Sequence, residues 1–131
     1  MAKIRGRPVE LKSLTTKQVT GHGTLYVTIT YKRKKKPFEV FIQVGKSDPC
    51  EKAYSEALAR CISIGLRYGI PAIAFVEQLR GLTCEPVSDP TRGIFIKSPA
   101  DALAVVMTDF INGHRNAVPP AGHSPTAEDG P

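Results

Sequence analysis

Alternation between apolar and polar side chains marks two segments in the first 45 residues of the chain, and a third segment there also predicts a strand by its composition. Residues 24–32 and 38–44 each repeat this two-residue period, and residues 14–20 form a shorter segment rich in threonine and valine. Such a period is typical of β-strands with one buried face. The two longer segments flank a lysine-rich loop and therefore predict an antiparallel hairpin. Their expected inward side chains are Leu25, Val27, Ile29, Tyr31, Phe38, Val40, Ile42 and Val44.

A helical period begins after residue 48. Asp48 is placed to cap the helix, with Pro49 at the first helical position and Glu51 three residues after the cap. Gly69 is suited to end this helix. The apolar positions that recur at helical spacing, and that we expect to face the core, are Ala57, Leu58, Cys61, Ile64, Gly65 and Tyr68.

The remaining elements are shorter. A second helix is predicted over residues 71–80, followed by a turn-rich connection over residues 83–91 and a short strand over residues 93–97. Ser98 then caps a third helix, which Gly113 ends. The chain is thus predicted to have an α+β fold, in which a small antiparallel sheet of three to four strands packs against two to three helices.

Positive charge is concentrated in the N-terminal part of the chain. Residues 1–46 contain eleven Lys or Arg and two Glu, a net charge of +9, whereas residues 47–131 contain seven against ten, a net charge of −3. We expect a basic arm over residues 1–12, a folded domain over residues 13–113 and a disordered tail over residues 114–131, which is rich in Pro, Gly, Ala and Ser. A basic half attracts phosphate groups.

Composition narrows the class of protein. A chain of 131 residues with 41% hydrophobic residues suits one domain with a modest core. No apolar run is long enough to span a membrane and no signal peptide is recognisable, so we expect a cytoplasmic protein without a membrane partner. Three cysteines without a secretion signal argue against a disulfide framework. Cys61 is expected in the core.

Several motifs resemble the TSCPD domain, which closes many adenosylcobalamin-dependent ribonucleotide reductases. They are Gly-His-Gly-Thr-Leu-Tyr-Val-Thr at residues 21–28, Pro-Phe-Glu-Val-Phe at 37–41, Gly-Lys-Ser at 45–47, Glu-Ala-Leu-Ala-Arg at 56–60 and Gln-Leu-Arg-Gly-Leu at 78–82. The resemblance covers about residues 12–111. It weakens at the closing motif, where the family typically reads Ser-Cys-Pro-Asp and this chain reads Lys97-Ser98-Pro99-Ala100.

The resemblance also raises the question of a metal. Many family members carry cysteine at the places of His22, Cys50 and Cys84, and Ser98 stands in the fourth place. These three residues could hold zinc if a fourth ligand or water completed a tetrahedron. The alternative is a loop histidine with two small, half-buried thiols. Because structural zinc sites normally keep all four ligands, we expect no metal and no other cofactor.

Four polar residues of the first helix lie at i, i+4, i+7 and i+11 and should share one face: Glu56, Arg60, Ser63 and Arg67. Arginine forks suit phosphate oxygens, although Glu56 and Arg60 also fit an ordinary exposed i,i+4 pair. Arg92 and Lys97 flank the short last strand and are expected to join from a neighbouring subunit. The full set predicted to bind a ligand is His22, Gly23, Lys46, Ser47, Arg60, Arg67, Arg92 and Lys97.

Two functional hypotheses follow. No Ser/His/Asp arrangement, paired carboxylates or phosphate-binding loop appears, so we expect no enzyme activity. The first hypothesis is an oligomeric, non-catalytic protein that binds a small phosphorylated nucleotide. Stand-alone domains of this kind resemble phage counter-defence sponges for cyclic nucleotides such as cyclic ADP-ribose derivatives, which would act in the host cytoplasm. The alternative is an accessory protein that docks on a ribonucleotide reductase or on nucleic acid through Lys32, Arg33, Lys34, Lys35 and Lys36. That loop also fits a solvated hairpin tip that prevents edge-to-edge pairing.

Overall fold

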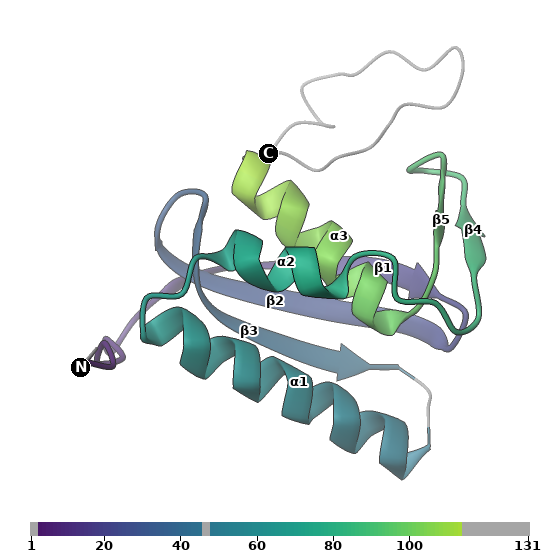
Figure 1. The fold of residues 1–131 in the computed structure, drawn as a ribbon. Coiled ribbons are helices and arrows are strands. Elements are labelled where there is room, and N and C mark those ends of the chain that lie inside the picture. Colours follow the sequence, from purple (N-terminus) through teal and green to yellow (C-terminus); the bar gives the residue numbers. More distant parts are fainter. Residues whose placement is uncertain (1–2, 46–47, 114–131) are drawn as a thin grey trace.

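The computed structural model describes residues 3–45 and 48–113 (Figure 1). Its centre is a three-stranded antiparallel sheet in the order β1-β2-β3. Helix α3 lies across this sheet, α2 packs against α3, and α1 runs along β3 (Figure 1). A second sheet of two short antiparallel strands lies beside β1. The elements are β1 (Lys12–Thr20), β2 (Gly23–Arg33), β3 (Lys36–Val44), α1 (Pro49–Arg67), α2 (Ala72–Leu79), β4 (Val87–Asp89), β5 (Ile94–Ile96) and α3 (Pro99–Asn112).

The predicted hairpin is confirmed by the pairing of β2 with β3. Leu25 lies opposite Val44, Val27 opposite Ile42 and Ile29 opposite Val40, so the apolar positions of both strands share one face. Helix α3 lies between that face and α2, so side chains all around it are almost completely buried: Ala102, Leu103, Ala104, Val105, Val106 and Met107. The structure therefore confirms the predicted α+β class.

Helix α1 covers the free edge of β3 as well as part of the core. Asp48 caps it by accepting a hydrogen bond from the backbone N–H of Glu51 at 2.9 Å. Farther along, the Ser63 hydroxyl donates to the carbonyl of Val40 and accepts from its N–H, both at 2.9 Å. A side chain thereby satisfies backbone groups of an edge strand that would otherwise be available for pairing with another chain.

The predicted core face of α1 is wrong for most of its positions. The helix buries Ala59, Ile62, Gly65 and Leu66, whereas Ala57, Cys61, Ile64 and Tyr68 are exposed. The buried face contains the small residues that let neighbouring elements approach closely. A Cβ atom on Gly65 would lie 2.5 Å from the ring of Phe75, which follows α1 in α2. Apolar periodicity shows two candidate faces here, and only packing selects between them.

A buried polar network fastens the β4–β5 hairpin, whose first strand falls in the predicted turn-rich connection. The Arg92 guanidinium donates to Gln18 Oε1 at 2.7 Å and lies 2.7 Å from Asp109 Oδ2. Gln18 in turn donates to Asp89 Oδ2 at 2.8 Å. All four side chains are at most 8% exposed. The network joins β1, the β4–β5 turn and α3, so it adds to the apolar contacts that Ile96 of β5 makes with the core.

Acid should weaken this network. Burial alone raises the pKa of Asp89, but hydrogen bonds from Thr91, from Gln18 and from the backbone N–H of Arg92 outweigh burial and hold the pKa below its ordinary 3.8. Folding therefore favours the ionised form, and its stabilisation is present above pH 3.8 and lost as the pH falls through the lower folded-state value. Urea unfolding at pH 6 and pH 3 should show that Asp89→Asn loses less stability on acidification than the wild type. An equal loss in both proteins would contradict this assignment.

The segment predicted as a basic arm lies against the domain in its described part. The N–H of Arg5 donates to the carbonyl of Arg67 at 2.9 Å. Arg7 forms an ion pair with Glu39 at 3.0 Å, and Thr30 donates to the same carboxylate. The last residue of the predicted arm, Lys12, already belongs to β1. The predicted tail over residues 114–131 lies outside the described residues.

Candidate functional site

Three cations surround one aromatic ring at the end of the sheet that carries the basic loop. Phe38, near the start of β3, is 2% exposed. Lys32 Nζ lies 4.9 Å from its ring centroid, Arg5 Cζ 5.3 Å and Arg67 Cζ 6.0 Å. They come from the end of β2, the N-terminal segment and the last turn of α1. Cations at these distances are attracted by the negative face of an aromatic ring.

Reciprocal backbone contacts fix two of these cations. The side chain of Arg5 donates to the carbonyls of Leu66 and Arg67 at the end of α1. The side chain of Arg67 donates to the carbonyl of Arg5 at 3.1 Å. Positive groups near the last carbonyls of a helix also interact favourably with its dipole. The N-terminal segment and α1 therefore hold each other in place, with both guanidinium groups near Phe38.

The cluster of Arg5, Lys32 and Arg67 has an excess of positive charge. In the part of the chain that the structure describes, none of the three lies within ion-pair distance of a carboxylate. The nearby Glu39 is already paired with Arg7. Fixed cations without counter-charges raise the local potential, and an arginine fork matches two oxygens of a phosphate. We therefore take this cluster as the candidate site for an anion.

The turn between β1 and β2 positions His22 at the opposite end of α1. A Cβ atom on Gly21 would lie 2.1 Å from the carbonyl oxygen of Glu85, and Gly23 has a φ of 104°, so glycine suits both positions. His22 Nδ1 lies 2.9 Å from Glu51 Oε1, and His22 Nε2 lies 3.7 Å from Glu85 Oε1. The imidazole thus links the turn to the first turn of α1 and to the loop before β4.

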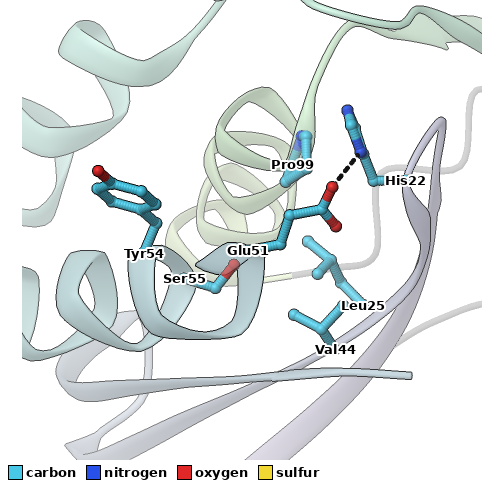
Figure 2. Close-up of a pocket in the computed structure, with 7 residues that line it drawn as sticks. All are labelled: His22, Leu25, Val44, Glu51, Tyr54, Ser55 and Pro99. Carbon is cyan, nitrogen blue, oxygen red and sulfur yellow. Dashed lines mark hydrogen bonds and ion pairs between the residues drawn. The ribbon is translucent and has the colours of Figure 1, made fainter. Parts of the chain in front are cut away.

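A small pocket of about 180 Å³ opens beside this histidine (Figure 2). Much of its wall is apolar, and the Glu51 carboxylate points toward His22 within it (Figure 2). A carboxylate in the wall disfavours a bound phosphate by like-charge repulsion. The pocket is therefore a poor phosphate site compared with the cation cluster. It is lined by His22, Leu25, Val44, Glu51, Tyr54, Ser55 and Pro99.

The structure separates the residues that the sequence predicts for one site. Glu51, which binds His22, and Arg67 stand sixteen residues apart on α1, about 24 Å along the helix axis at 1.5 Å per residue. His22 and Gly23 thus lie at one end and Arg67 at the other. Lys46 and Ser47, predicted to add donors at the N-terminal end, lie outside the described residues.

The four polar residues predicted to share one face of α1 also have different surroundings in the structure. Arg60 pairs with Glu56 at 2.8 Å, and both side chains are more than 60% exposed, which confirms the alternative interpretation of an ordinary i,i+4 pair. Ser63 faces the backbone of β3 rather than solvent. Only Arg67 belongs to the cation cluster. Helical spacing predicts that these residues lie together. In the structure each of them contacts a different group, because only part of this face meets β3.

Two further predicted residues lie elsewhere. Arg92 is 4% exposed and bound within the network to Gln18 and Asp109, so the expectation that it contacts a ligand from a neighbouring subunit requires correction. The positive charge of Arg92 is paired with carboxylates inside the fold. Lys97 is exposed, and its backbone N–H donates to Asp101 at 3.0 Å.

The cysteines differ from expectation in their exposure. Cys50 and Cys84 are exposed rather than half-buried, and Cys61 is exposed rather than part of the core. Within residues 3–45 and 48–113, no three His, Cys, Asp or Glu side chains are grouped so that they could hold a metal ion. The zinc alternative through His22, Cys50 and Cys84 thus gains no support from the geometry. None of the helices in these ranges is long and apolar enough to cross a membrane.

Comparison with known proteins assigns the family. A family model for the TSCPD domain matches residues 2–111. The chain belongs to the TSCPD domain family. No curated protein and no solved structure matches it. The resemblance predicted over about residues 12–111 is thereby confirmed, and in this TSCPD domain Phe38 lies within one of the motifs that suggested it, Pro-Phe-Glu-Val-Phe at residues 37–41.

Sequence reasoning did not include Arg5 and Phe38 in the candidate site, and it considered Lys32 only for docking on nucleic acid or a reductase, or as part of a solvated hairpin tip. Arg5 lies in a segment without periodicity, so no pattern places it beside α1. Phe38 has the alternation of a core residue, and it is a core residue. One available signal is the position of Lys32 and Phe38 at facing ends of the two hairpin strands, which brings them near each other beside the connecting loop.

Proposed function

We propose that this TSCPD domain is a non-catalytic binding protein for small phosphorylated nucleotides. The observation that carries the proposal is the cluster of Arg5, Lys32 and Arg67 around Phe38 without a carboxylate partner among the described residues. Phosphate oxygens accept charge-assisted hydrogen bonds from guanidinium and ammonium groups, and these bonds are about twice as strong as neutral ones.

A purely structural role explains only part of the cluster. Arg5 binds the last carbonyls of α1 and so has a local reason for its position. The Lys32 ammonium group has no hydrogen bond within the described part of the chain and approaches Phe38 from the hairpin. Three like charges around one ring repel one another, and a bound phosphate would remove that repulsion. A ligand with more than one phosphate fits the number of cations best.

The finer proposal concerns the biological use of binding. A domain that binds a nucleotide without converting it can sequester a signal, and family analogy suggests phage counter-defence against cyclic ADP-ribose-type molecules. Such a ligand carries two linked phosphates, which matches a site with three cations. This use rests on analogy, whereas the preference for phosphate rests on the cluster.

A thermal-shift panel tests the proposal. The purified chain should be heated with cyclic mononucleotides, cyclic dinucleotides, cyclic ADP-ribose, nucleoside triphosphates and the matching nucleosides. A phosphorylated ligand should raise the Tm with increasing concentration by mass action, and its nucleoside should not. Chromatography of the recovered ligand should show it unchanged. Absence of a shift with every phosphorylated compound, or an equal shift with nucleosides, would contradict the proposal; a converted ligand would contradict its non-catalytic part.

A further inference from the structure

The pocket beside His22 has the size and the lining of a site for a small ligand with an apolar body (Figure 2). Its volume of about 180 Å³ exceeds the roughly 150 Å³ of an engineered cavity that holds one benzene molecule. Leu25 of β2, Val44 of β3 and Pro99 of α3 supply apolar wall. The rim is accessible to solvent, because Tyr54, which also lines the pocket, is 79% exposed. A single ring or a short alkyl chain therefore fits.

The polar part of the pocket is a carboxylate with one unused oxygen. His22 Nδ1 lies 2.9 Å from Glu51 Oε1, whereas Glu51 Oε2 makes no hydrogen bond within the part of the chain that the structure describes. Glu85 lies on the other side of the imidazole, 3.7 Å from His22 Nε2. Within residues 3–45 and 48–113, no lysine or arginine forms an ion pair with Glu51 or Glu85. A ligand with a charged N–H donor can therefore use the second oxygen of Glu51.

The local charges favour a cationic ligand over an anionic one. Residues from the first turns of α1 and α3 line the pocket, and each helix N-terminus contributes a partial charge of about +0.5. Glu51 and Glu85 each contribute a full negative charge, which outweighs both helix ends while the imidazole is neutral. The exposed ring of Tyr54 also attracts a cation.

We propose that this pocket binds a small organic cation, an ammonium or guanidinium group on a short apolar stem. The stem lies against Leu25, Val44 and Pro99. The charged head donates to Glu51 Oε2. This site is independent of the cluster that includes Arg67, because about 24 Å of α1 separates the two. A free amine and a lysine side chain of a partner protein present the same chemistry to the pocket.

Ligands of matched size test the charge and the stem separately. The full chain, labelled with ¹³C in its methyl groups, should be titrated at pH 7.5 and constant ionic strength with n-butylammonium, n-butanol, butyrate and ammonium. We expect n-butylammonium to shift the methyl signals of Leu25 and Val44 with a Kd of about a millimolar, as befits so small a ligand. The other three should bind at least about tenfold more weakly, because each lacks either the charge or the stem. Equal binding of n-butanol or butyrate, or no shift at these methyl groups, would overturn the proposal.

Two variants test the pocket itself. Glu51→Gln keeps the size of the side chain and removes its charge, so it should weaken n-butylammonium binding by about tenfold or more. This change also alters the contact with His22, so the second variant is Ser55→Leu, which leaves both residues in place, fills the pocket and should abolish binding. The matched control is Glu77→Gln, which removes an exposed carboxylate from α2, a helix that does not line the pocket. Unchanged binding in Glu51→Gln or Ser55→Leu would contradict the assignment.

A capped lysine, N-acetyl-lysine N-methylamide, distinguishes the two sources of the cation. Its side chain has the same four-carbon stem and ammonium group as n-butylammonium, and its backbone adds bulk at the far end. Binding as tight as that of n-butylammonium assigns the pocket to a lysine side chain of a partner. Weaker binding assigns it to a free amine. If neither compound binds, the pocket is not a cation site.

Discussion

Replacing Arg92 with alanine should lower the free energy of unfolding by about 3–5 kcal/mol. Arg92 joins Gln18 of β1 to Asp109 of α3, and its removal leaves the carboxylates of Asp89 and Asp109 buried without their cation. An uncompensated charge in a buried site is far more costly than a lost surface contact. Urea unfolding followed by circular dichroism measures the change.

The matched control is Arg60→Ala, because Arg60 pairs with Glu56 in solvent. That substitution should change stability by about 0.5 kcal/mol or less. Arg92→Lys should fall between the two, since a single ammonium group lacks the fork that reaches both partners. If Arg92→Ala were as stable as Arg60→Ala, the network would not fasten the β4–β5 hairpin.

Local patterns predicted most of the fold. Strands β2 and β3 follow from two-residue periodicity, and their pairing follows from the short loop between them, whereas β1 was predicted from its threonine and valine content. Both caps are local as well: Asp48 binds the N–H of Glu51, and Ser98 binds the N–H of Asp101. Each of these predictions depends on neighbours in sequence, so no tertiary contact was needed to make it.

The errors concern features that tertiary contacts decide. Strand β4 has three residues, too few for periodicity to show, and its Asp89 is held by Gln18 from β1. The buried state of Arg92 could not be foreseen, because its partners lie 74 and 17 positions away. Cys61 was expected in the core because α1 has two apolar faces, and sequence alone does not identify the one that meets β3.

The candidate site shows the same division. Arg67 was predicted to bind a ligand because a guanidinium group suits phosphate oxygens. It was grouped with Arg60 only because helical spacing places both residues on one face. In the structure its neighbours are Arg5 and Lys32, which come from other parts of the chain. A site built from three separate segments requires the fold before its members can be recognised.

Removing two charges from the cluster should abolish nucleotide binding. In a Lys32→Gln/Arg67→Gln variant, two charge-assisted hydrogen bonds to phosphate are lost, each contributing about 1.5–3 kcal/mol, so affinity should fall by at least about a hundredfold. Arg5 is kept because it binds the end of α1. The matched control, Lys17→Gln/Lys97→Gln, removes the same charge from exposed lysines elsewhere. It should bind within about twofold of the wild type, since distant exposed charges are largely screened by salt.

Isothermal titration of the best phosphorylated ligand from the thermal-shift panel is the most direct test of phosphate binding at the Arg5, Lys32 and Arg67 cluster. The wild type and Lys17→Gln/Lys97→Gln should give similar Kd values. Lys32→Gln/Arg67→Gln, titrated at a temperature well below its own Tm, should give little or no heat at the same concentrations. Equal Kd values in all three proteins would contradict the account, because the phosphates would then bind somewhere other than the cluster around Phe38.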